Sequence, residues 1–101
     1  MKPLIVEEEA ELELLGSIAF YEERMLGLGL DFEAASRRAL KIIASAPKRW
    51  PIGKHGTRRY VMRRFPFVIH YIDVPDKIWI VAFAHTSRKP GYWKGRTRST
   101  E

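Results

Sequence analysis

Apolar residues in the second half of the chain alternate with the short period of β-strands. Three consecutive runs, residues 58–65, 67–74 and 78–85, are rich in β-branched and aromatic side chains. Pro66 separates the first two runs, and residues 74–77 supply turn chemistry between the second and third. We therefore predict three consecutive antiparallel strands. The second and third are apolar on both faces, which favours central positions in the sheet.

In the first half, apolar residues recur every three to four positions, which is the period of an amphipathic helix. We predict one helix over residues 8–26, with carboxylates in its first turns, where the helix dipole favours them. The following Gly-Leu-Gly predicts a reversal of the chain. A second helix is predicted to have Asp31 as its N-cap and to end before Pro47.

The predicted fold class is α+β, with a helical hairpin packed on a mainly antiparallel, four-stranded sheet. Residues 3–6 are expected to supply the remaining strand at one edge. Residues 47–57 are predicted to form a loop, anchored on the core by Trp50. The chain has 101 residues, enough for a single domain with one core. The polar tail from residue 94 is expected to be mobile unless a partner orders it.

Composition removes several classes of protein and site. The chain contains no cysteine, which excludes disulfides, thiol catalysis and thiolate-bound zinc. Its longest apolar run, residues 78–84, is far shorter than a membrane span. Glu7 follows too soon after the start for the apolar region of a signal peptide. We expect a cytoplasmic protein.

Charge is divided unevenly along the chain. Residues 1–46 hold five Lys/Arg and nine Asp/Glu, whereas residues 47–101 hold thirteen and three. The half that contains the predicted strands is therefore strongly basic. This asymmetry indicates a polyanionic partner, either nucleic acid or an acidic protein segment. The alternative is a solvated basic surface that keeps the protein soluble.

The sequence gives little support for a metal or cofactor site. The three histidines lack the short spacings of a metal site and have no carboxylate cluster near them in the sequence. Beyond Glu33 the only acidic residues are Asp73, Asp76 and Glu101. Residues 27–31, GLGLD, match no nucleotide-binding fingerprint. We expect no cofactor and no metal.

What remains is a cationic cluster with aromatic side chains, suited to binding phosphates and stacking on bases. The cluster comprises Arg58, Arg59, Arg63, Arg64, His85, Arg88, Lys89, Tyr92, Trp93, Lys94 and Arg96. Such residues could support metal-free RNA cleavage, in which a 2′-hydroxyl attacks the adjacent phosphate. His85 could exchange protons near neutral pH, while Arg88 and an arginine of the first strand stabilise the phosphorane.

Each candidate also has a purely structural interpretation. His85 could close its strand by hydrogen bonding to the following loop. Tyr92 and Trp93 could form a hydrophobic clasp that folds the tail onto the core. His70 is expected to pack near the helices instead of acting as a catalyst.

The element order and two motifs resemble the RelE/ParE superfamily of bacterial type II toxins, which includes plasmid stabilisation proteins. The motifs are residues 58–72, RRYVMRRFPFVIHYI, and residues 78–93, IWIVAFAHTSRKPGYW. The resemblance covers nearly the whole chain. It implies a growth-inhibiting toxin that is neutralised by a cognate antitoxin, whose acidic segment would wrap around the helices and the basic sheet.

Two activities diverge within this superfamily. RelE-like members cleave messenger RNA on the ribosome, and Arg63, Arg88 and Tyr92 fall near their basic residues and C-terminal tyrosine. These three and His85 are the predicted catalytic residues if the chain is a ribonuclease. ParE-like members inhibit DNA gyrase without being enzymes, and residues 85–90, HTSRKP, resemble that branch somewhat more.

Val68 replaces an arginine that RelE-like enzymes usually carry, so ParE-like inhibition is slightly preferred. A decayed toxin that only binds its antitoxin is a third possibility. For RNA or partner binding the predicted residues are Arg58, Arg59, Arg64, Lys89, Trp93, Lys94 and Arg96.

Overall fold

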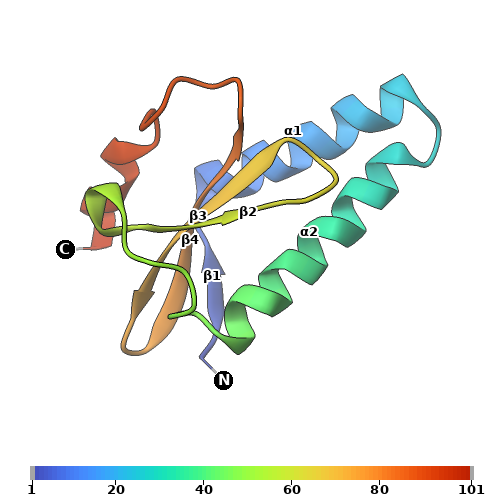
Figure 1. Cartoon of the computed structure of the whole chain (residues 1–101). Coiled ribbons are helices and arrows are strands. Elements are labelled where there is room, and N and C mark those ends of the chain that lie inside the picture. Colours follow the sequence, from blue (N-terminus) through green and yellow to red (C-terminus); the bar gives the residue numbers. More distant parts are fainter. Residues whose placement is uncertain (1, 101) are drawn as a thin grey trace.

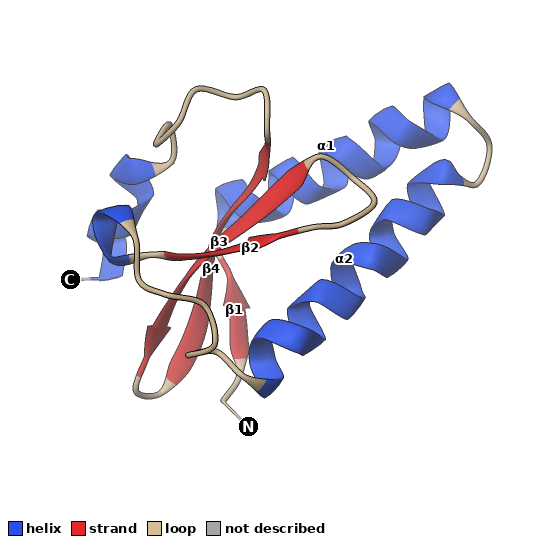
Figure 2. Cartoon of the chain, viewed as in Figure 1, coloured by secondary structure: helices blue, strands red, loops and turns tan. Residues whose placement is uncertain are grey.

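Four strands form one sheet in the order β1-β4-β3-β2 (Figures 1 and 2). A computed structural model describes residues 2–100, with side chains for 2–97. The strands are β1 (Leu4–Val6), β2 (Arg58–Val61), β3 (Phe67–Val74) and β4 (Lys77–His85). β1 is parallel to β4, and the other two pairings are antiparallel. The predicted edge strand, the two central strands and the mainly antiparallel sheet are confirmed.

Two antiparallel helices, α1 (Glu8–Arg24) and α2 (Leu28–Ser45), cover one face of this sheet (Figure 1). The core between them is rich in aromatic side chains. Phe32 of α2 packs edge-on against Phe65 with 5.0 Å between ring centroids, and lies 4.8 Å from Phe67. Burying each such ring contributes about 1.5–3 kcal/mol. The predicted helical hairpin is confirmed, and Trp50 does pack against its core.

The opposite face of the sheet carries a smaller apolar cluster of Trp79, Val81, Ala82 and Trp93. The chain after β4 folds back across this face and ends in a 3-10 helix, η2 (Lys94–Thr100). Within the tail that was expected to be mobile, Arg96 is ion-paired to Glu13 of α1. Glu101 lies outside the described residues.

The first of the three predicted consecutive strands is shorter than expected. β2 ends at Val61, and a tight turn follows, in which Phe67 N–H donates to the Phe65 carbonyl at 2.8 Å. The turn directs the buried side chains of Met62 and Phe65 into the core beneath the helices. The free energy gained by burying these two side chains outweighs the hydrogen bonds that a longer β2 would form with β3.

The helix boundaries also differ from the prediction. α1 ends at Arg24, and α2 starts at Leu28 after Gly27, so Asp31 is not its N-cap but lies in its first turn. The carboxylate of Glu22 supplies the missing cap, accepting from Gly27 N–H at 2.8 Å and Gly29 N–H at 3.0 Å. Because this capping carboxylate belongs to the preceding helix, the sequence around the start of α2 does not reveal it.

Gly29 sets how closely the two helices approach. A Cβ at this position would lie 2.5 Å from the carbonyl oxygen of Ile18 and 2.9 Å from Cβ of Glu22. Gly16, in the middle of α1, offers a matched control, because a Cβ added there would meet no atom of the surrounding structure within 4 Å.

We expect Gly29→Ala to lower the free energy of unfolding by about 1–3 kcal/mol, because the helices must separate. Gly16→Ala should raise it by about 0.5–1 kcal/mol, because alanine favours a helix interior. Urea denaturation of both variants checks the pair. Equal effects would contradict the close approach at Gly29.

Candidate functional site

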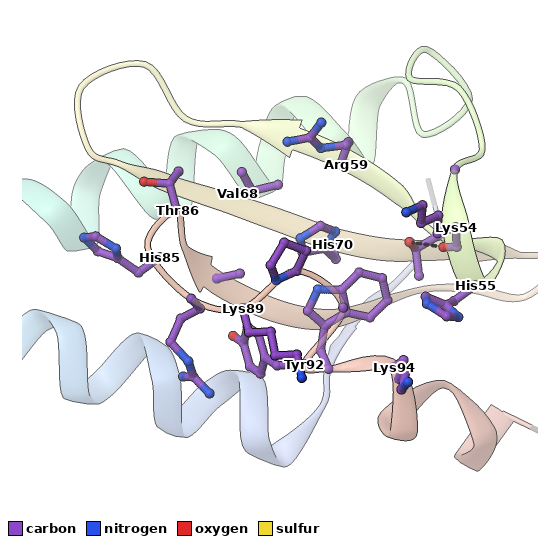
Figure 3. A pocket seen from close by; sticks show the side chains of 17 residues that line it. Lys54, His55, Arg59, Val68, His70, His85, Thr86, Lys89, Tyr92 and Lys94 are labelled. Atoms are coloured by element: carbon purple, nitrogen blue, oxygen red, sulfur yellow. Dashed lines mark hydrogen bonds between the residues drawn. The ribbon is translucent and has the colours of Figure 1, made fainter.

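A cavity of about 630 Å³ lies on the sheet face opposite the helices (Figure 3). Its walls come from β2, β3 and β4, from a short 3-10 turn, η1 (Lys54–Gly56), and from residues 86–94. Five of the lining residues are Lys or Arg, three are His and none is acidic. These are Lys54, Arg59, Arg88, Lys89 and Lys94, with His55, His70 and His85. The cavity is therefore suited to an anionic group.

Strand register brings the floor of the cavity together. Arg59 lies opposite His70 across β2 and β3, and Val68 lies opposite Ala84 across β3 and β4. Figure 3 shows Arg59, Val68 and His70 along the floor, with Lys54 and His55 at one end and His85 at the other. Val68 thus contributes an apolar side chain to the floor, beside the cations of the cavity.

One end of the cavity has an unusual backbone conformation. His55 adopts φ 61°, a left-handed conformation that costs free energy for a residue other than glycine. Its ring faces Gly91, which has φ 76°, and a Cβ at Gly91 would lie 3.8 Å from His55 Nε2. The η1 turn and the segment after β4 therefore meet at this point.

Trp93 fills the space between two of the histidines. Its ring lies 4.3 Å from that of His70 at 31°, and 5.5 Å from that of His55 at 89°. Because Trp93 is only 5% exposed, it is not free to stack on a nucleic-acid base. His70 therefore lies on the sheet face away from the helices, and its expected packing near them is wrong.

The environment of His70 favours the neutral imidazole. Burial, together with the nearby charge of Arg59, lowers its pKa from 6.5 to about 4, against a smaller opposite effect of Glu13. His70 is thus neutral at physiological pH and contributes a ring surface, not a charge.

Glu13 of α1 fixes the segment that forms the outer wall. Its carboxylate accepts from Phe83 N–H at 3.1 Å, from Arg96 at 2.8 and 3.1 Å, and from the hydroxyl of Tyr92. The guanidinium of Arg88 lies 3.8 Å from the centre of the Tyr92 ring. Burial, and then the hydrogen bond to Glu13, raise the pKa of Tyr92. Tyr92 and Trp93 therefore clasp the tail onto the core.

His85 has contacts that match its structural interpretation. Its Nδ1 accepts from Ser87 N–H at 3.0 Å and lies 2.7 Å from the Ser87 hydroxyl. With Nδ1 accepting, the proton of neutral His85 sits on Nε2. The ring closes β4 onto the following loop and still lines the cavity.

The structure brings together only part of the predicted set. His85, Arg88 and Tyr92 line the cavity, as do Arg59, Lys89, Trp93 and Lys94. Arg63 is exposed and does not line it.

The other predicted binding residues make internal contacts. Arg58 donates to the carbonyls of Lys48 and Trp50, and Arg64 pairs with Asp31 at 3.2 Å. Arg96 is held by Glu13, with its Nε 3.2 Å from Glu9.

Lys54 and His55 were missed because their loop carries no periodic pattern. Their only sequence signal is that two cationic or titratable residues stand between glycines, and only the fold places them at the cavity. In the described part of the chain, no group of three or more His, Asp or Glu could hold a metal ion. No helix among the described residues is long and apolar enough to cross a membrane.

The same arrangement of elements occurs in a solved structure described as "Chromosomal ParDE TA system from P. aeruginosa". The matching chain has a TM-score of 0.68 and 18% sequence identity, over 86% of this chain and 98% of that one. The chain therefore has a ParE-like fold. No protein-family model matches its sequence, nor does any curated protein. The predicted RelE/ParE-like fold is thereby confirmed, and at this identity the likeness concerns the fold.

The stability of this ParE-like fold should depend on pH through His70. Its pKa is lower in the folded than in the unfolded chain, so the unfolded chain takes up the proton first as pH falls. The contribution of neutral His70 to the free energy of unfolding is therefore complete above pH 6.5 and is lost progressively as the pH falls toward 4. His70→Phe keeps a ring against Trp93 but cannot titrate.

Between pH 7 and pH 4.5 we expect the parent to lose about 2 kcal/mol more unfolding free energy than His70→Phe. Urea denaturation at both pH values measures the difference, and protonation of carboxylates cancels between the two proteins. An equal loss in both would show that His70 is protonated freely in the folded state.

Proposed function

We propose that this chain is the toxin of a type II toxin–antitoxin module and is neutralised by a cognate antitoxin. The shared fold with a chain of a ParDE system supports the proposal. So does a large cavity lined by cations and free of carboxylates among the described residues, which suits an acidic partner segment. The alternative of a decayed toxin predicts antitoxin binding without any growth effect.

We further propose that the toxin acts as ParE-like proteins do, by binding and inhibiting DNA gyrase and not by cleaving RNA. The observation that carries this choice is the hydrogen bond from the Tyr92 hydroxyl to Glu13. A hydroxyl that donates to a carboxylate, and whose pKa is raised, is poorly placed to remove a proton at neutral pH.

Two further observations support the same choice. Val68 places an apolar side chain on the cavity floor, where the ribonuclease branch would carry a phosphate-stabilising arginine. Arg63 lies outside the cavity. His85 is then the remaining proton-transfer group of the predicted set, whereas RNA cleavage requires one proton to be removed and another delivered.

A ribosome-dependent ribonuclease is the second candidate. His85 and Arg88 share one cavity with Lys54 and Arg59, which is an arrangement able to hold a phosphodiester beside an imidazole. In that case Arg59 or Lys54 would supply the charge that is absent at Val68.

We expect the purified chain to inhibit gyrase supercoiling, and His85→Gln to retain inhibition within about twofold, since His85 does no chemistry in a binding mechanism. Primer extension on translating ribosomes is the matched measurement. Cuts in the A-site codon that disappear in the His85→Gln variant would overturn the gyrase proposal. Unimpaired supercoiling with excess folded toxin would do so as well.

Antitoxin binding should be electrostatic at the cavity. Arg59→Glu with Lys89→Glu should weaken the complex by about tenfold or more, because a like charge would face the acidic segment. Lys77→Glu with Arg24→Glu makes the same change in net charge at positions that do not line the cavity. Calorimetry at low and high salt tests both pairs. Affinity that did not weaken with salt would contradict the electrostatic interface.

A further inference from the structure

The outward face of α2 carries a second cationic surface, separate from the cavity. The helix turns four small or apolar residues toward the core, namely Phe32, Ser36, Ala39 and Ile43. At 100° per residue, Arg37, Arg38 and Lys41 fall on the opposite side, and all three are exposed. Lys48 and Arg49 follow just after the helix and are also exposed, with Lys48 paired to Asp73 and Arg49 over the Trp50 ring. We call these five cations the α2 ridge.

Almost nothing neutralises this ridge. Between Glu33 and Asp73 the sequence holds ten Lys/Arg and no carboxylate. Among the described residues, Arg38 and Lys41 make no ion pair, and Arg37 pairs only with Glu33 at 3.1 Å, one turn away. Lys48 reaches Asp73 at 3.0 Å, yet its side chain stays 79% exposed. The positive charge therefore faces solvent.

The shape of the ridge suits a rigid, extended partner. Ala34 and Ser45 are exposed on the same side of α2, so small side chains flank the cations and leave them accessible. In Figure 1 no other element lies on the outer side of α2. From Arg37 to Ser45 the helix rises about 12 Å, which spans several phosphates of a nucleic-acid duplex.

The ridge offers cations but no stacking platform. Its nearest aromatic residue, Trp50, is half-buried and packs edge-on against Tyr60 with 5.1 Å between ring centroids. Single-stranded nucleic acid is normally held by exposed rings on which bases stack. An acidic peptide would also require apolar pockets, and the large apolar side chains that α2 exposes are Ile42, beside the cations, and Leu30, about two turns before Arg37. A charged backbone without base contacts fits this surface best.

We propose that the α2 ridge binds the phosphate backbone of duplex DNA without reading its sequence. The helices cover one face of the sheet and the cavity opens on the other, so the ridge and the cavity can be occupied at the same time. This binding goes beyond the proposed toxin activity and does not depend on it. The protein would then bind DNA directly, without a partner protein.

Fluorescence anisotropy of the full chain with a labelled 30-base-pair duplex tests the proposal. With about four phosphates neutralised, affinity should fall by about a hundredfold between 50 and 200 mM salt. Arg38→Glu with Lys41→Glu should weaken binding by at least about tenfold and reduce the salt slope by about two. Arg38→Gln with Lys41→Gln, which keeps good helix formers, should weaken binding in the same direction.

Arg24→Glu with Lys77→Glu is the control of equal net charge and should leave affinity within about threefold. Equal losses in the ridge and control variants would overturn the proposal in favour of diffuse attraction. Tighter binding to a single strand, or equally tight ridge-dependent binding to polyglutamate, would also overturn it. Because the assay contains no gyrase, ribosome or antitoxin, its result is independent of the proposed toxin activity.

Discussion

The carboxylate of Glu13 connects three parts of the molecule that are distant in sequence. It projects from α1, accepts a backbone N–H of β4, and binds both Tyr92 and Arg96 of the C-terminal segment. β1 pairs only with residues 78–80 of β4, so beyond that point this carboxylate and Arg96 satisfy polar groups along the strand edge. The Glu13 side chain is only 15% exposed, and its negative charge is tolerated there because its carboxylate oxygens accept hydrogen bonds from a backbone N–H, a hydroxyl and a guanidinium.

The cavity depends on this connection. With Tyr92 and Arg96 held at α1, Trp93 is fixed against His70, and residues 88–94 become the outer wall. The same contact holds the Tyr92 side chain against α1. Function on a common fold is decided by such local contacts, since one backbone arrangement can support quite different activities. The proposed binding mechanism, without chemistry, is supported by a valine on the cavity floor and a tyrosine bonded to glutamate.

Charged side chains in this protein are segregated on different surfaces of the fold as well as along the sequence. The carboxylates concentrate on α1, whereas cations line the cavity on one side of the sheet and the outer face of α2 on the other. The two cationic surfaces differ in kind. The cavity is concave and includes titratable and aromatic rings, whereas the α2 ridge is convex and has no exposed ring. A concave surface can enclose a partner segment, while a convex one can only contact a long polyanion from outside.

Hydrophobic periodicity by itself determined the helical hairpin, the two central strands and the edge strand. Those features depend on which face of each element is apolar, and that is written locally in the chain. The resemblance to RelE/ParE toxins rested instead on the element order and two sequence motifs. The tertiary structure decided the rest. It ended β2 at Val61 so that Phe65 could join the core, capped α2 with Glu22 of the preceding helix, and placed His70 away from the helices. It also brought Lys54 and His55 to the cavity and bound Tyr92 to Glu13, 79 residues away. Contacts between distant residues have no periodic signature, because burial and partner geometry select them only after the elements have packed.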